Sequence, residues 1–474
     1  MIFTSNIFLF LFLPTFLAVY YAVGSAWRSL VIVGGSYLFY AWWRPDFLFL
    51  FLGVTVWNYY LGAIIHRSLE QDRRKAFRWL TLGVIGNLAA LGYFKYANFG
   101  ADVLAAALQP MGIETFTLEK IILPLGISFY IFQAISYIVD IYRKEAEPAN
   151  NFIDFAAFIA LFPQLIAGPI LRYKLIDQQL KERTHSWELF SLGASRFILG
   201  FTKKVLIADS LAPISAEFMS SPSLTASEAW FGAAVALIQL YFDFSGYSDM
   251  AIGLGMMMGF RFAENFNQPF MCMSLTEFWR RWHLTLADFL KDYVYKPLLR
   301  TGKVNNDGAL FCTMLLSGFW HGASVAFILF GLYFAIFMVL ERRYGYVTDI
   351  TSPYSFIKNL IAVWLVIAVM PLFATGDAGQ AWTIYQGMVG LNGFGDISRY
   401  VLATSQLNMA FVGIALAWIA IAGFMNRRFY TWPDRPYLMQ SVAGVQAILL
   451  WVAFSLAITR LAANSFSPFL YFQF

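Results

Sequence analysis

The sequence predicts an all-α integral membrane protein, a polytopic helical bundle of about 11–12 spans with additional re-entrant or interfacial helices. Hydrophobic residues make up 59% of the 474 residues and charged residues 13%, and the mean hydropathy is +0.61. Soluble domains usually carry roughly a quarter charged residues. Because backbone groups cannot stay unpaired in lipid, the apolar stretches should be helices. They also lack the apolar–polar alternation of outer-membrane strands.

Stretches suited to a bilayer core, which needs about 20 mostly apolar residues, recur along almost the whole chain. They lie at about 3–23, 29–43, 47–65, 79–95, 121–142, 152–171, 189–213, 229–259, 309–340, 355–373, 406–425 and 441–459. The run at 309–340 could form two short spans broken near His321-Gly322, and 97–108 could be re-entrant. Residues 1–21 lack the basic segment and cleavage site of a signal peptide, so we expect a retained first span.

No hydrophilic block is long enough to fold separately, so we expect residues 1–474 to form a single membrane domain. The net charge of +5 comes from basic residues in short loops, which does not indicate a nucleic-acid partner. Positive loops tend to be cytoplasmic, which would place the N-terminus in the periplasm of a Gram-negative bacterium. The cluster behind this orientation contains Arg67, Arg73, Arg74, Lys75 and Arg78.

Two polar segments interrupt the apolar pattern. Residues 241–249 place Asp243 and Asp249 inside a segment of membrane-like composition. Residues 277–283 read Glu-Phe-Trp-Arg-Arg-Trp-His. As one helix, Glu277 and Arg281 would be four residues apart and could pair, while Arg280 and His283 would share another face. Ionisable groups interleaved with tryptophans predict an interfacial or cavity-lining helix.

His321 is the strongest candidate for chemistry. It follows the apolar run Leu315-Leu-Ser-Gly-Phe-Trp, and a titratable group at membrane depth suggests a functional site by default. Imidazole suits proton transfer near neutral pH. The alternative is a histidine satisfied by a helix–helix hydrogen bond. His66 and His185 lie in polar surroundings and are expected to be solvated loop residues.

The sequence contains no motif for a serine hydrolase, a zinc protease or a metal or redox site. There is no G-x-S-x-G elbow, no H-E-x-x-H motif, and no metal or redox spacing around Cys272 and Cys312, so no metal is expected. Helix-breaking prolines at membrane depth are tolerated where they line a protein-enclosed cavity. Pro124, Pro163 and Pro169, together with a buried histidine, therefore favour a tunnel over a plain bundle.

The chain resembles the membrane-bound O-acyltransferase (MBOAT) family, and within it the branch that O-acetylates alginate. The matching stretches run nearly from end to end and are highly specific when taken together. They are residues 3–14, 91–99, 123–130, 165–169, 241–269, 276–283, 319–322 and 467–474.

The resemblance implies a fold around a membrane-traversing tunnel and an O-acetyltransferase in the bacterial inner membrane. Acetyl-CoA would be the co-substrate, entering from the cytoplasm. By position, His321 corresponds to the family's catalytic histidine, a general base, and His283 to its second, tunnel-lining residue. Arg280, Arg281 and Trp320 are the expected acetyl-CoA-binding residues, although the two arginines could instead be structural. Acetyl groups would pass to periplasmic acetyltransferase partners that modify an exopolysaccharide, with alginate expected.

Two departures from the family pattern leave other substrates open. After residues 293–298 the family commonly has Gly-Gly-Asn-Arg, whereas this chain reads Leu-Arg-Thr-Gly-Lys-Val-Asn. Near 371–374 the family often has Phe-Arg, and that arginine is missing. A cellulose-acetylating relative therefore remains an alternative. A transporter of an acetyl donor or polysaccharide precursor, and a non-catalytic assembly scaffold, are alternatives from other classes.

Overall fold

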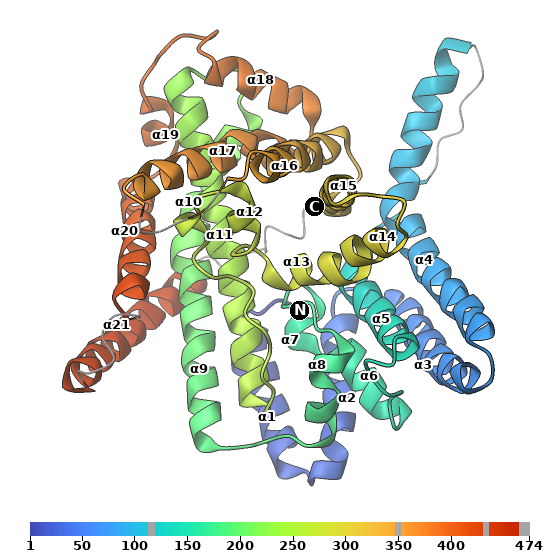
Figure 1. Cartoon of the computed structure of the whole chain (residues 1–474). Helices are drawn as coiled ribbons and strands as arrows, with labels where there is room; N and C mark the ends of the chain where they lie inside the picture. The colour runs from blue at the N-terminus through green and yellow to red at the C-terminus, as the bar shows by residue number, and fades with distance from the viewer. Residues whose placement is uncertain (112–118, 347, 349–351, 430–435, 464–474) are drawn as a thin grey trace. The chain divides into compact units, whose positions relative to one another are not determined.

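A computed structural model describes residues 1–111, 119–346, 348, 352–429 and 436–463, and Figure 1 shows its helices. The chain divides into two compact units. The first comprises Met1–Ala194 with Ala251–Ala263, and the second comprises Ser195–Met250 with Glu264–Phe474. Within the described residues, helices are the regular elements, and β pairing is limited to a bridge between Phe266 and Trp282. The predicted all-α class is confirmed.

The first unit is built from consecutive helices. They are α1 (Leu13–Ala22), α2 (Arg28–Ala41), α3 (Phe47–Gln71), α4 (Arg73–Leu108), α5 (Ile127–Tyr142), α6 (Phe152–Ala160), α7 (Phe162–Leu165) and α8 (Tyr173–Lys181). Two longer helices, α9 (Trp187–Thr202) and α11 (Ala226–Met257), each contain a unit boundary. Residues 97–108 continue α4 as a helix, so the re-entrant alternative is not observed.

The second unit contains α10 and the helices from α12 onwards. They are α10 (Asp209–Ser220), α12 (Leu275–Trp279), α13 (Leu284–Leu290), α14 (Lys296–Arg300), α15 (Asn306–His321), α16 (Val325–Arg343), α17 (Ser355–Thr375), α18 (Ala378–Met388), α19 (Ser398–Ala403), α20 (Gln406–Phe429) and α21 (Pro436–Ala463). Single π-helical turns connect several of them, including Lys203–Ala208 after α9 and Lys291–Tyr295 after α13.

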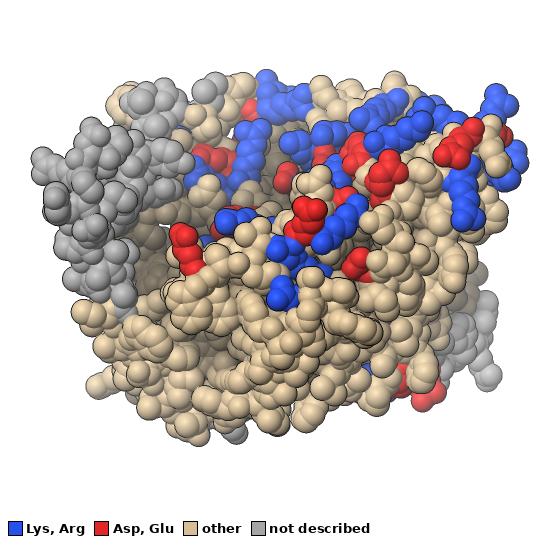
Figure 2. Space-filling view, turned by 90° about the horizontal axis from the view of Figure 1, so that it is seen from below, with Lys and Arg blue, Asp and Glu red and all other residues tan. Residues whose placement is uncertain are grey.

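Among the described residues, three helices are long and apolar enough to cross a membrane, namely α3, α16 and α17. Shorter apolar helices cover Phe8–Ala22, Ile127–Tyr142, Gln406–Ala422 and Ile448–Ala463. Phe49 on α3 and Trp364 on α17 are exposed, as expected for side chains that face lipid tails. In Figure 2, most of the visible Lys, Arg, Asp and Glu side chains gather over one part of the face, where both signs occur, and the rest of this face carries few charges.

Inside the first unit, polar side chains join neighbouring helices. Asn58 of α3 and Asn87 of α4 are fully buried and exchange two hydrogen bonds, of 2.9 and 2.7 Å. Each amide donates to the other's carbonyl oxygen, which satisfies both groups where water is absent. Such interhelical bonds are a common means of association in apolar surroundings.

The predicted break in 309–340 is confirmed, because α15 ends at His321 and α16 begins at Val325. The Ser324 hydroxyl accepts a hydrogen bond from the Phe327 N–H and so starts the second helix. The two helices pack closely because Gly318 faces Gly331, where a Cβ on Gly318 would overlap backbone atoms. This hairpin fixes the position of His321 at a helix end.

The prediction of one helix across 277–283 is wrong. The helix α12 ends at Trp279, and His283 has a left-handed backbone conformation, with φ 48° and ψ 53°. Such a conformation is rare for a residue with a side chain and needs support from its surroundings. That support comes from a short pairing with residues 265–267, in which the Leu284 N–H donates to the Asn265 carbonyl at 3.0 Å.

Candidate active site

His283 is fully buried at the start of α13. Its Nδ1 lies 2.9 Å from the Asn265 Oδ1 atom, and its ring is nearly perpendicular to the Phe244 ring, at 4.7 Å between centroids. Nε2 is buried and has no hydrogen-bond partner among the described residues. A nitrogen of this kind can accept a hydrogen bond or a proton from a bound molecule.

His321 is the last residue of α15 and is also buried. Its ring lies 5.1 Å from the Phe373 ring and 5.9 Å from the Phe330 ring, centroid to centroid. Trp320 lies 6.1 Å from the His283 ring and 4.9 Å from the His321 ring. The structure therefore brings the two predicted histidines to the same indole, although 38 positions separate them in the sequence.

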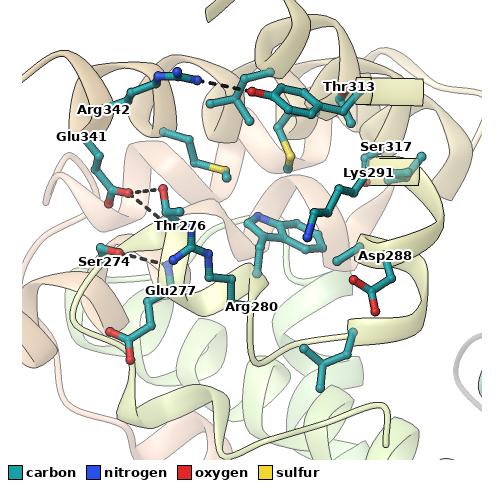
Figure 3. Close-up of a pocket in the computed structure, with 18 of the residues that line it drawn as sticks. Ser274, Thr276, Glu277, Arg280, Asp288, Lys291, Thr313, Ser317, Glu341 and Arg342 are labelled. Atoms are coloured by element: carbon teal, nitrogen blue, oxygen red, sulfur yellow. Dashed lines mark hydrogen bonds between the residues drawn. The ribbon is translucent and has the colours of Figure 1, made fainter. Parts of the chain in front are cut away.

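A cavity of about 760 Å³ is lined by segments that lead to these histidines, and Figure 3 shows residues of its lining. One wall is the face of α15 that carries Leu310, Thr313, Met314 and Ser317. This i, i+3, i+4, i+7 spacing defines one helical face, and its next positions are Trp320 and His321. A second wall begins at Leu284, directly after His283. Neither histidine lines the cavity, but both lie at the ends of elements that do.

The cavity has charged groups of both signs. Its cations are Arg280, Lys291 and Arg342, and its carboxylates are Glu277, Asp288 and Glu341. Figure 3 shows the Lys291 side chain extending into the hollow, with its nitrogen pointing away from Ser317. Sequence reasoning identified Arg280 but missed Lys291 and Arg342. Nothing in the sequence pointed to either residue, because the cavity forms only when distant segments come together.

Two of the carboxylates are occupied by structural interactions. The Glu341 carboxylate accepts backbone N–H groups of Leu275 and Thr276, at 2.6 and 2.9 Å, and so holds the start of α12. The Glu277 Oε1 atom accepts two hydrogen bonds from Arg281, at 2.9 and 2.7 Å, which confirms the predicted i, i+4 pair. Arg280 and Lys291 have no ion pair with a described residue.

Arg280 and Arg281, adjacent in sequence, differ in environment. Arg280 is exposed and lines the cavity. Arg281 does not line it and is bound to Glu277. Of the two arginines, Arg280 is therefore the one whose positive charge is accessible in the cavity.

The acidic residues of 241–249 lie within α11 and are buried in ion pairs. The Lys204 ammonium lies 2.7 Å from the Asp243 carboxylate, and the Lys203 ammonium lies 2.7 Å from the Asp249 carboxylate. Arg196 also contacts Asp249, at 2.6 Å. These distances give both aspartates a role in holding α11 against α9 and the π-helical turn that follows it.

The remaining histidines and the cysteines lie elsewhere. His66 is within α3, 3.6 Å from Glu147, rather than in a loop. His185 is in the connection before α9 but is only partly solvated, because it contacts the Tyr20 hydroxyl at 3.0 Å and Arg28 at 2.9 Å. The cysteines form no disulfide. Within the described part of the chain, no cluster of three His, Cys, Asp or Glu residues is arranged to hold a metal ion.

Comparison with known proteins shows which family the chain resembles. The family model for the membrane-bound O-acyltransferase family matches residues 47–374. The chain is 45% identical to a probable alginate O-acetylase AlgI of Pseudomonas putida and 44% identical to that of Pseudomonas syringae pv. tomato, over 100% of both chains in each case. It is 34% identical to a peptidoglycan O-acetyltransferase of Helicobacter pylori, over 83% of this chain and 80% of the relative.

The matched region includes both histidines, Trp320 and every residue that lines the cavity. The terminal stretch 467–474, which contributed to the resemblance in sequence, lies outside the described residues. The helical fold, the membrane-spanning helices and the matches over the whole chain lead to one assignment. This protein belongs to the membrane-bound O-acyltransferase family, and it is a membrane-embedded O-acyltransferase that uses an acyl donor.

Proposed function

We propose that this protein is an inner-membrane O-acetyltransferase that takes acetyl groups from cytoplasmic acetyl-CoA. It passes them across the membrane to periplasmic acetyltransferase partners that O-acetylate an exopolysaccharide. Alginate is the proposed polymer, because the relatives matched over their whole length are named alginate O-acetylases. Residues 1–474 act as one membrane domain in this proposal.

The observation that supports the proposal most directly is the placement of both histidines at the ends of elements that line the cavity. A CoA ester carries several negative charges, and Arg280 and Lys291 offer cations in the cavity that no described carboxylate neutralises. Arginine is suited to phosphate because its planar fork can donate two parallel hydrogen bonds. We propose that Arg280 and Trp320 contact the donor, and that Arg281 acts indirectly by fixing Glu277.

The proposed step is acyl transfer by general base catalysis. His321 takes the proton of the acceptor hydroxyl, whose oxygen then attacks the thioester carbonyl carbon. A C–O bond forms, the C–S bond breaks, and the CoA thiolate leaves and takes up a proton. His283 holds one of the reacting groups through Nε2. The apolar surroundings of both rings keep competing water away from the thioester.

The test uses purified protein in lipid nanodiscs with acetyl-CoA labelled in the acetyl group. Wild-type protein should release free CoA, and His321→Ala should lower the rate by at least about 100-fold, the usual contribution of a general base. The same variant should abolish polymer acetylation in producing cells at normal protein levels. Acetylation that persists in His321→Ala would contradict the base assignment. Transfer of intact acetyl-CoA across a vesicle membrane, without CoA release, would instead identify a transporter.

A further inference from the structure

Asn265 contacts His283 through both its backbone and its side chain. The Asn265 carbonyl accepts the Leu284 N–H, and its Oδ1 atom lies 2.9 Å from His283 Nδ1. The same Oδ1 atom accepts the Thr285 hydroxyl at 2.9 Å and the Thr285 backbone N–H at 3.3 Å. All three side chains are buried, with Asn265 and His283 at 0% exposure and Thr285 at 5%.

The backbone N–H of Thr285 determines which atom of the amide is the oxygen. Side-chain amide orientations are normally assigned from hydrogen-bond networks, since oxygen and nitrogen scatter alike. A backbone N–H can only donate, so the Asn265 atom facing it must be the carbonyl oxygen. A carbonyl oxygen can only accept, and His283 Nδ1 must therefore be the protonated nitrogen of the ring.

The tautomer follows from this contact. A neutral imidazole with a proton on Nδ1 presents a lone pair at Nε2. His283 Nε2 is the buried atom that lacks a partner among the described residues. The backbone conformation contributes as well, because the left-handed φ of 48° at His283 is held by the pairing of 265–267 with 281–284. Replacing Asn265 would thus affect both the proton position and the ring orientation.

We propose that Asn265, assisted by Thr285, is a positioning residue that fixes His283 in the Nδ1–H tautomer, so that Nε2 is the nitrogen that accepts a hydrogen bond from the reacting substrate. The inference rests on the proposed function, in which His283 contacts that substrate. It gives Asn265 a role in the rate of acetyl transfer rather than in donor binding.

The test measures kcat and KM for CoA release from acetyl-CoA by the full-length protein in nanodiscs. Asn265→Leu keeps the approximate size but removes the acceptor, and should lower kcat by about 10- to 100-fold, as loss of a histidine's hydrogen-bond partner does in metal sites. Thr285→Val removes one hydroxyl and should lower kcat about threefold. KM for acetyl-CoA should stay within about twofold in both, because neither side chain lines the cavity.

Two further variants separate positioning from folding. Asn265→Asp restores an acceptor for Nδ1–H and the Thr285 hydroxyl, and should retain more activity than Asn265→Leu. Asn267→Ala changes an exposed asparagine two positions away and should behave as wild type. If Asn265→Leu does not accumulate as folded protein, the test compares Thr285→Ser with Thr285→Val. The serine variant keeps the hydroxyl and should have the higher kcat.

His283→Ala, measured in the same assay, distinguishes this inference from the proposed function. If His283→Ala loses activity while Asn265→Leu and Thr285→Val keep the wild-type kcat, the positioning role is refuted and the role of His283 stands. A rise in KM at constant kcat in the Asn265 variants would also overturn the inference. If His283→Ala itself has wild-type kcat, the proposed role of His283 fails, and the positioning role fails with it.

Discussion

The second unit contains two groups of charged residues that differ in how their charges are balanced. We call the first the ion-pair cluster; it consists of Arg196, Lys203, Lys204, Asp209, Asp243, Asp249 and Glu264. Its lysine ammonium groups lie 2.6 or 2.7 Å from carboxylates, and Arg196 bridges Asp249 and Glu264 at 2.6 and 2.7 Å. The second group lines the cavity beside the histidines. There, Arg280 and Lys291 have no carboxylate partner among the described residues.

The difference shows how to interpret charged residues in an apolar chain. A buried charge is costly unless it is paired, so a saturated pair has a structural role and its loss should appear as lost stability. A cation that faces an open cavity without a carboxylate partner contributes little to folding stability and is available to bind a ligand. The two groups should therefore respond to substitution in opposite ways, with stability affected in one and substrate binding in the other.

The largest effect is expected for Asp243→Ala in the ion-pair cluster. Lys204 is almost completely buried, and the substitution removes the Asp243 carboxylate that lies 2.7 Å from its ammonium group. Removing one partner of a buried pair costs about 3–5 kcal/mol of unfolding free energy. Thermal unfolding of the purified protein in detergent should show this loss. Asp177→Ala is the control, because it removes a partly exposed pair with Lys181 and a hydrogen bond from the Gln178 N–H, and should cost only about 1 kcal/mol.

An unchanged unfolding temperature in Asp243→Ala would show that the pairs are not structural, and the distinction between the two groups would fail. Reduced CoA release per folded molecule would extend the role of Asp243 to catalysis.

The next effect is expected for Arg280→Ala in the cavity. A charge-assisted hydrogen bond to a phosphate contributes enough that its loss should raise KM for acetyl-CoA about tenfold. The unfolding temperature should stay unchanged, because Arg280 has no ion pair to lose. Increasing salt should weaken donor binding in wild-type protein more than in the variant, since exposed charges are screened. Equal KM values in the two proteins would remove Arg280 from the donor site.

A smaller effect is expected for Arg281→Ala. This residue is adjacent to Arg280 but is bound to Glu277 and lies outside the cavity lining. Loss of a partly exposed i, i+4 pair should cost about 1 kcal/mol or less. KM for acetyl-CoA should change less than twofold. A tenfold rise in KM would instead make both arginines donor contacts, as the family resemblance first suggested.

The sequence predicted the helical class and the break at His321-Gly322 because those features depend on local signals. Apolar composition determines the first, and a glycine next to a helix end indicates the second. The pairing of Glu277 with Arg281 was predicted from a separation of four residues on a helix. It forms although α12 ends at Trp279, because the Trp282 N–H still donates to the Phe278 carbonyl and continues the turn.

The end of α12 at Trp279 and the left-handed conformation of His283 were not predictable from local sequence. Nothing within 277–283 signals a break; the hydrogen bonds that stabilise it come from Asn265, 18 positions away. The cavity cations were missed for a related reason. Arg342 and Glu341 come from the end of α16 and join the site only through tertiary folding. The residue spacing along one helix cannot predict contacts between residues that are far apart in the sequence.

The smallest effect concerns a histidine in the first unit, where a titratable group lies beside cations rather than carboxylates. Burial lowers the pKa of His185 below its ordinary value, and Arg28 and then Arg183 lower it further. The folded protein therefore favours the neutral ring. This contribution to stability is complete above the unfolded pKa of about 6.5 and is lost as the pH falls towards the lower folded pKa. The unfolding temperature should fall between pH 7.5 and 5.5 by less in His185→Gln than in wild type. Identical pH dependence would show that the cations around His185 are screened by solvent and do not alter its protonation on folding.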